Sequence, residues 1–232
     1  MTTPNAVSFM DSKINTLYET ELGRLAETTR AACDALFAAI PSKPFLLFVN
    51  PPTHQLIYNV VLPAGRIQKL IVAANKKRGE TRAEWEFRRD RVSHLRTVLG
   101  NVSLPAIESA AVRNSLEHFD ERLDDINRHL IAWRAASPGE RTVLTGIGLI
   151  VWDTVAAPES TPDLPLVRLA GGPPNSLPFV PIRLYAARSR LLMHWDDVLN
   201  LQALRDECAA ISNALSPRFS VDPNATDPLV VA

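Results

Sequence analysis

The sequence predicts a mainly helical protein, an up-and-down bundle of four to five helices with a small antiparallel β insertion before the last helix. Between residues 12 and 133, apolar residues recur at steps of three and four, the period of a helix buried on one face. Beyond residue 140 the pattern changes to alternation, and seven of the eighteen prolines fall between residues 158 and 181. Such a composition is typical of short strands and loops.

These patterns divide the chain into four parts. We assign residues 1–139 to a helical bundle, 140–190 to a β-rich insertion packed on the bundle, 191–217 to the final helix and 218–232 to a flexible tail. The 232 residues, 46% of them hydrophobic, are enough for one substantial core.

Charge and cysteine content exclude several protein classes. Lys and Arg number 25, as do Asp and Glu, so any basic site must be regional. Cys33 and Cys208 lie far apart in the sequence, which argues against a disulfide framework or a cysteine metal site. The N-terminus lacks a signal-peptide pattern and no apolar run is long enough to span a bilayer, so we expect a cytoplasmic protein without membrane contact.

The N-terminal half contains the first helices. Residues 12–40 form one long predicted helix that ends before Pro41, and residues 45–49 are an apolar run that fits either a strand or a buried helical turn. A second helix follows Pro52, and we expect Pro63 and Gly65 to kink or split it.

A third helix is predicted from Arg82 to Leu99. Thr81 and Glu84 have the capping-box spacing, and Gly100 is well placed to end the helix. Between Lys76 and Arg96, eight basic residues stand against four acidic ones, a local charge of +4. Two interpretations remain open, a solvated helix face with internal ion pairs or a patch that faces phosphate.

The next helix has the strongest pattern in the chain. Ser103 and Pro105 predict its start, and we carry it from residue 104 to residue 133 as one helix. Its apolar residues fall at alternating steps of four and three and predict one buried stripe: Val112, Leu116, Phe119, Leu123, Ile126, Leu130 and Trp133.

The polar residues of this helix include Arg113, Asn114 and His118. Five Arg–His pairs in the chain fit the same loose spacing, so spacing alone does not select a site. Asn114 and the amphipathic helix favour Arg113 and His118, whereas Arg89, followed by Asp90, and His94 remain a competing pair.

The Arg-Asn-x-x-x-His phrase from Arg113 to His118 resembles the signature of the HEPN superfamily (higher eukaryotes and prokaryotes nucleotide-binding). The resemblance covers about ten residues and the helical context before them, and it does not extend to residues 140–232. It implies a dimeric helical bundle and a metal-independent ribonuclease, in which His118 is general acid or base and Arg113 stabilises the phosphorane. Arg113 and His118 lie about 140° apart on a helix, so a composite site would need the second copy of a homodimer.

Two functions therefore remain open from the sequence. One is a HEPN-like, metal-independent endoribonuclease that acts on RNA, as a toxin or phage-defence effector with an antitoxin or regulatory protein as partner. The other is a non-catalytic helical module for dimerisation or ligand binding. The sequence has no P-loop or dinucleotide fingerprint, and we predict no cofactor and no metal. His194 and Asp197 are expected to begin the last helix.

Overall fold

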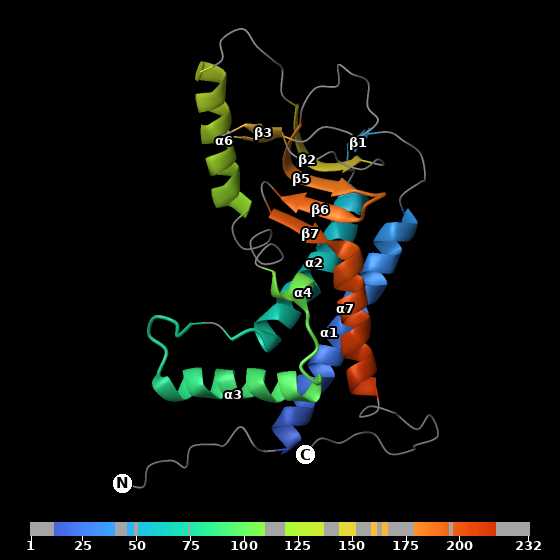
Figure 1. Cartoon of the computed structure of the whole chain (residues 1–232), viewed down its shortest axis with the longest axis vertical. Helices are drawn as coiled ribbons and strands as arrows, with labels where there is room; N and C mark the ends of the chain where they lie inside the picture. The colour runs from blue at the N-terminus through green and yellow to red at the C-terminus, as the bar shows by residue number, and fades with distance from the viewer. Residues whose placement is uncertain are drawn as a thin grey trace.

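The computed structural model describes residues 12–39, 46–48, 51–73, 75–109, 119–136, 144–151, 159–161, 164–166, 179–194 and 197–216. It confirms a mainly helical protein with a small sheet ahead of the last helix. Figure 1 shows the sheet at one end of the molecule with one helix beside it, and most of the other helices toward the other end. Among the described residues, no helix combines the length and the apolar character needed to cross a bilayer.

Three long helices lie side by side below the sheet (Figure 1). Helix α1 (Ser12–Ala39) has the predicted extent, and it packs against α2 (Pro51–Ile71) and α7 (Leu201–Leu215). Of the two outcomes expected at Pro63 and Gly65, a kinked or a split helix, the split does not occur, because α2 continues through Pro63. Pro63 and Gly65 are both buried, and we attribute the continuity to the packing of this flank, which offsets the backbone hydrogen bond that proline cannot donate.

Helix α3 (Arg82–Val98) lies across the lower ends of the other helices (Figure 1). The predicted capping box is present: the Glu84 amide donates to the Thr81 hydroxyl oxygen at 3.2 Å, and the Thr81 amide donates to the Glu84 carboxylate at 2.8 Å. Gly100 follows the helix with φ of 67°, a left-handed conformation that suits glycine. Leu95 and Leu99 are buried and anchor the end of α3 in the core.

The predicted single helix from residue 104 to 133 is wrong. Helix α4 (Pro105–Glu108) ends at Ser109, whose ψ of 132° is not helical, and α6 (Phe119–Ala136) is a separate element. The reason is a long-range cap, since the Gln68 side-chain amide donates to the carbonyls of Glu108 and Ser109 at 3.1 and 2.9 Å. The last carbonyls of a helix have no partner within the helix, and here the Gln68 amide supplies that partner.

The predicted stripe is tested only on α6. Ile126 and Leu130 are buried there, whereas Leu123 and Trp133 are half-buried. The other stripe positions, Val112, Leu116 and the Phe119 side chain, lie outside the described part of the chain.

The sheet has five strands in the order β1-β2-β5-β6-β7: Leu46–Phe48, Leu144–Val151, Phe179–Ala186, Leu191–His194 and Asp197–Asn200. The last three strands are antiparallel, as predicted, but β2 pairs with β5 in parallel. Strand β1 resolves the ambiguity at residues 45–49 and brings the N-terminal half into the sheet. A separate pair consists of β3 (Glu159–Thr161) and β4 (Leu164–Leu166).

The final helix begins at Leu201 rather than at residue 191. His194 ends strand β6 and Asp197 begins strand β7, which pair antiparallel, so the prediction that His194 and Asp197 begin the last helix is also wrong. Short strands of four residues carry too little alternation to be recognised in sequence. Asn200 supplies the actual N-cap, because its side-chain oxygen accepts the Ala203 amide at 2.9 Å.

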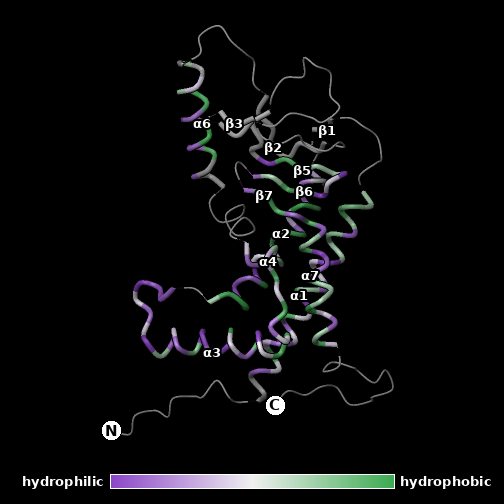
Figure 2. The backbone as a smooth tube through the Cα atoms, viewed as in Figure 1, coloured by the Kyte–Doolittle hydropathy of each residue, from purple (hydrophilic) through white to green (hydrophobic). Residues whose placement is uncertain are grey.

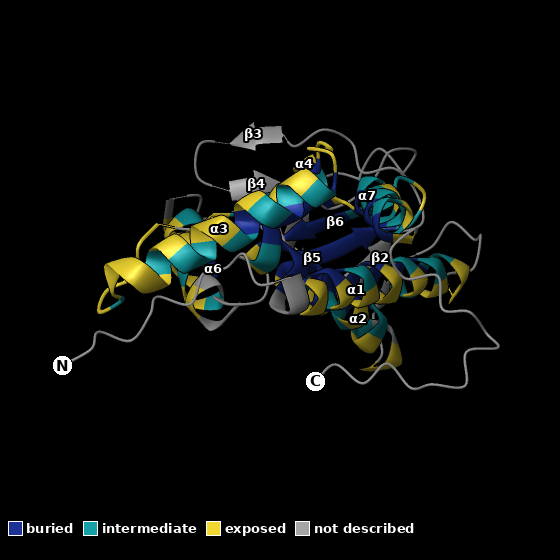
Figure 3. Cartoon of the chain, turned by 90° about the horizontal axis from the view of Figure 1, so that it is seen from below, coloured by how far each residue is buried: buried dark blue, intermediate teal, exposed yellow. Residues whose placement is uncertain are grey.

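One hydrophobic core joins the helices to the inner face of the sheet. It includes Leu22 of α1, Ile67 of α2, Tyr185 of β5 and Leu204 of α7, all at most 1% exposed. Figure 2 shows hydrophobic and hydrophilic residues alternating along the long helices, whereas the segment before α3 is mainly hydrophilic. Figure 3 shows β5 and β6 buried among the helices and the N-terminal end of α3 exposed.

Candidate nucleic-acid interface

The residues of the predicted catalytic motif, Arg113, Asn114 and His118, lie outside the described part of the chain. The described chain stops at Ser109 and resumes at Phe119. The geometry of that motif is therefore untested, and the hypothesis stays a prediction from sequence.

The competing pair, Arg89 and His94, makes two separate contacts on α3. His94 Nε2 lies 2.7 Å from Oε1 of Glu19, a side chain of α1 that is 7% exposed. The Arg89 guanidinium instead lies over the Trp85 ring, 4.9 Å from its centroid. His94 thus joins α3 to α1, and Arg89 lies on another face of the helix.

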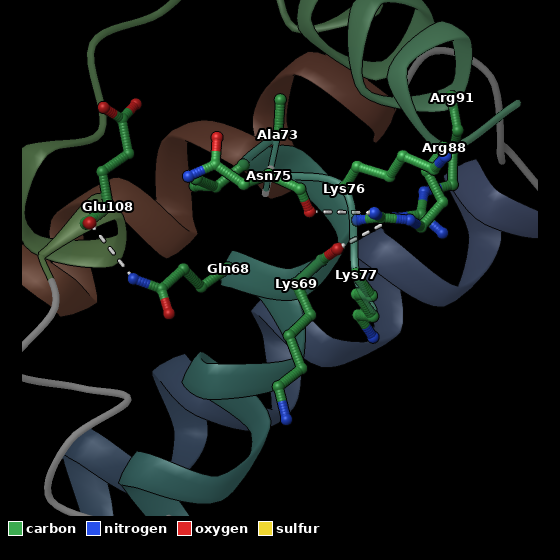
Figure 4. Close-up of a pocket in the computed structure, with 10 residues that line it drawn as sticks. Gln68, Lys69, Ala73, Asn75, Lys76, Lys77, Arg88, Arg91 and Glu108 are labelled. Carbon is green, nitrogen blue, oxygen red and sulfur yellow. Dashed lines mark hydrogen bonds between the residues drawn. The ribbon is translucent and has the colours of Figure 1, made fainter. Parts of the chain in front are cut away.

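Among the described residues, a basic hollow of about 750 Å³ lies between α2, the segment at 75–77 and α3 (Figure 4). Its lining is Gln68, Lys69, Val72, Ala73, Asn75, Lys76, Lys77, Arg88, Arg91 and Glu108. Five of these side chains are cationic and one is anionic. We call this feature the basic hollow.

A turn before α3 fixes one wall of the basic hollow. The Glu80 amide donates to the Lys77 carbonyl at 3.2 Å, and Gly79 takes φ of 81° between them. The Glu80 carboxylate in turn accepts the Lys77 amide at 2.9 Å and holds Arg88 by two hydrogen bonds of 2.6 and 2.7 Å. These bonds tie the lysine-bearing segment to α3.

Further bonds join α3 to α2 and to the segment at 75–77. Arg91 Nη2 donates to the Lys69 carbonyl at 2.9 Å, and Arg88 Nη2 donates to the Asn75 carbonyl at 3.3 Å. Figure 4 shows Lys69 and Lys77 extending in the same direction from the two walls. The arginines therefore brace the hollow while the lysines carry ammonium groups at the ends of flexible stems.

The carboxylates around the basic hollow are bound to other groups. Glu108 pairs with Arg96 through Nη2, and that arginine also donates to the Ile71 carbonyl at 3.1 Å. The Arg88 guanidinium and the Lys77 amide lower the pKa of Glu80 to about 2, so Glu80 is ionised at neutral pH and offsets the Arg88 charge. Lys69, Lys76, Lys77 and Arg91 supply the remaining positive charge of the lining.

The structure supports the solvated-face interpretation of the basic segment, and phosphate binding stays a prediction. Arg82, Arg88 and Arg96 form ion pairs, as expected for a solvated helix face. Lys76, Lys77 and Arg91 line a concave surface, as expected for a phosphate-facing patch. Sequence reasoning missed Lys69, because it belongs to a different helix and reaches the hollow only through tertiary packing.

A second polar group, also missed from sequence, lies inside the molecule where the sheet meets α2. Arg183 and His194 are 4% and 3% exposed, and each lies next to one of the paired residues Leu184 and Met193 of β5 and β6. Arg183 Nη1 donates to the Tyr58 hydroxyl at 2.9 Å, and its guanidinium lies 4.9 Å from that ring. Burial and then the Arg183 charge lower the pKa of His54, one helical turn before Tyr58. These contacts fasten β5 to α2.

Comparison of the chain with protein-family models finds no match, and neither characterised proteins nor solved structures match it. Within the described ranges, no three His, Cys, Asp or Glu side chains gather in a way that would hold a metal ion. Among the described residues, we take the basic hollow as the candidate site because five cationic side chains line it.

Proposed function

We propose that this protein binds RNA and that the basic hollow holds the phosphates of the RNA strand. The observation that supports this function is the lining itself, in which five cationic side chains from three segments surround about 750 Å³. Lys and Arg contacts to phosphate release counterions and supply most of the affinity of such proteins. The carboxylates Glu80 and Glu108 are held in ion pairs, which reduces their repulsion of an approaching phosphate.

Salt dependence of binding provides the test. The affinity for a labelled twelve-nucleotide single-stranded RNA is measured by fluorescence anisotropy between 50 and 300 mM salt. Each phosphate contact to a single strand contributes a slope of about −0.7 in log affinity against log salt concentration. The double substitution Lys76→Gln and Lys77→Gln should weaken binding and make the slope shallower by about 1.4.

The matched control removes two positive charges elsewhere. Arg24→Gln with Arg30→Gln changes the net charge equally, and both arginines lie on α1 in ion pairs with Glu21 and Glu27. This control should change the slope little. Equal effects of the two double variants would reject the basic hollow as the RNA site.

We further propose that the bound RNA is cleaved by the HEPN-like motif. One structural relation supports a link between motif and hollow: Glu108 lines the hollow and precedes Arg113 by five residues. Five residues span at most about 18 Å. In the proposed reaction the 2′-hydroxyl attacks the adjacent phosphorus and the 5′-oxygen leaves, with His118 moving a proton and Arg113 stabilising the phosphorane.

Cleavage is tested in the presence of EDTA. The expected products carry 2′,3′-cyclic phosphates, and His118→Ala should abolish cutting without loss of fold. His94→Ala should retain cutting, because His94 is bonded to Glu19 at the α1–α3 contact. Loss of cutting in His94→Ala alone would place the reaction on α3. If RNA of all classes stays intact, also with partners co-purified from the source cell, the non-catalytic binding module replaces the ribonuclease.

The remaining parts of the proposal concern assembly and role. A homodimer would bring two copies of Arg113 and His118 together, and light scattering at tens of micromolar tests it directly. A toxin or phage-defence effector should arrest growth when expressed, and His118→Ala should relieve the arrest. A strict monomer would remove the composite site.

A further inference from the structure

Helix α3 carries a continuous arc of cationic and aromatic side chains that starts in the basic hollow. At about 100° per residue, Arg91, Arg88, Trp85 and Arg89 follow one another around the helix at steps of about 60°, 60° and 40°. Arg91 and Arg88 line the hollow, and Arg89 is exposed at the other end of the arc. Trp85 therefore lies between the hollow and the open surface.

The arginines on this helix are held in different ways. Arg82 and Arg88 form ion pairs with Glu86 and Glu80. Arg89 instead places its guanidinium carbon over the Trp85 ring, 4.9 Å from the centroid, and we call this cation–π pair the Trp85–Arg89 stack. Because Arg89 is exposed, a planar group from solvent can reach this pair.

We propose that the Trp85–Arg89 stack is a platform for an unpaired base, and that it makes the protein selective for single-stranded RNA. This inference rests on the proposed function, since the hollow must hold the phosphates. Bases of single strands stack on aromatic rings and on arginine planes, whereas bases inside a duplex have no free face. Trp85 precedes Arg88 by three residues, about 4.5 Å along the helix axis. A phosphate held in the hollow beside Arg88 by Lys76, Lys77 or Arg91 thus lies within one helical turn of the stack, and the base of that nucleotide can reach it.

The carboxylates near Trp85 and Arg88 are bound to other groups or lie on another face of α3, so they do not oppose an RNA strand that runs from the hollow to the stack. Glu84 lies on the same arc, but its carboxylate is bound to the amide and hydroxyl of Thr81, both at 2.8 Å. Glu86 is paired with Arg82 at 2.7 Å. Asp90 lies about 140° around the helix from Trp85 and off the arc.

The test separates stacking from charge by using three probes of equal length. These are a single-stranded oligouridine, a duplex RNA and an abasic ribose-phosphate oligomer that has the charges but no bases. Trp85→Leu removes the ring, Trp85→Phe retains an aromatic plane, and Arg89→Lys keeps the charge but loses the guanidinium plane.

The oligouridine affinity should fall about 5- to 150-fold in Trp85→Leu, the range for loss of one stacked base. Arg89→Lys should also lower the oligouridine affinity. The affinity of Trp85→Phe should stay within about threefold of that of the wild type. The salt slope should stay unchanged in all three variants. The abasic oligomer should bind the wild type and Trp85→Leu equally, and duplex should bind more weakly than oligouridine.

A fluorescence measurement guards against a misfolded variant. The difference in emission between the wild type and Trp85→Phe isolates Trp85 from the other three tryptophans. Oligouridine should quench this difference signal, and the abasic oligomer should not.

Different results would reject base stacking at Trp85 and RNA binding by the basic hollow. If the abasic oligomer binds the wild type as tightly as oligouridine while Lys76→Gln with Lys77→Gln still reduces the slope, the platform is rejected and RNA binding stands. Tight duplex binding likewise rejects the platform. If no RNA binds, or if the lysine variant changes nothing, both proposals fail.

Discussion

Removal of the Glu207 side chain should destabilise α4, although Glu207 lies about one hundred residues later in the sequence. The Glu207 carboxylate, on α7, accepts the amides of Ala106 and Ile107 at 2.8 and 2.9 Å, so it caps the start of α4. The same short helix ends at Glu108, which lines the basic hollow. The cap therefore supports one wall of the candidate site.

The magnitude follows from two opposing effects. Loss of both acceptors in Glu207→Ala leaves two helix-start amides without their partners, at a cost of about 2 to 4 kcal/mol. Burial, however, raises the pKa of Glu207 more than the two amides lower it. The negative charge is thus a net cost and the acceptor geometry is the gain. Glu207→Gln keeps one acceptor oxygen without the charge and should cost at most about 1 kcal/mol at pH 7.

The sign of the pH dependence follows from the raised pKa. The folded state binds the Glu207 proton more tightly than the unfolded state, so the free energy of unfolding falls as pH rises above the ordinary value of 4.5. The wild type should therefore lose stability relative to Glu207→Gln across this window. Urea unfolding between pH 4 and 7 measures the difference, and amide exchange at Ala106 and Ile107 reports on the cap.

Glu86→Ala is the control, because Glu86 makes an exposed i,i+4 pair with Arg82 and should cost less than about 0.5 kcal/mol. The reasoning is refuted if Glu207→Gln costs as much as Glu207→Ala, or if the advantage of the wild type over Glu207→Gln grows with pH.

Three further predictions concern buried or bonded groups. Tyr58→Phe removes the acceptor of a hydrogen bond from buried Arg183 and should lower the free energy of unfolding by about 1 to 3 kcal/mol, as measured by urea unfolding. Burial raises the pKa of the Cys33 thiol to about 12 and raises that of Cys208 as well, so both should resist alkylation at pH 8 until the protein is unfolded. The Glu80 carboxyl should titrate near pH 2 by NMR rather than near 4.5, and its contribution to stability should be lost as pH falls through this window.

Local sequence signals predicted the helices whose ends are set by residues within the helix or next to it. Helix α1 follows its apolar period, and α3 starts at the predicted capping box of Thr81 and Glu84. Strands β2 and β5 follow alternating or β-rich runs. In each case the residues that decide the element lie within it or next to it.

Boundaries set by distant residues could not be predicted. The end of α4 depends on Gln68, about forty residues earlier, and its start depends on Glu207. The same limit applies to the candidate site, where the count of charges between residues 76 and 96 identified a basic region but not its shape. Lys69 joins that region only because α2 and α3 pack together.

The packing of α1 against α7 has a consequence for the synthesis of the chain. The buried face of α1, with Leu22, Leu25 and Leu36, is partly covered by a helix that starts about 160 residues later. During translation, α7 is complete only after Leu215 has left the ribosome. Until then the part of the α1 face that α7 covers is exposed. Such late closure exposes an incomplete chain to aggregation and chaperone capture. A ribosome stalled anywhere before α7 would therefore release a product in which the face of α1 that α7 covers stays exposed.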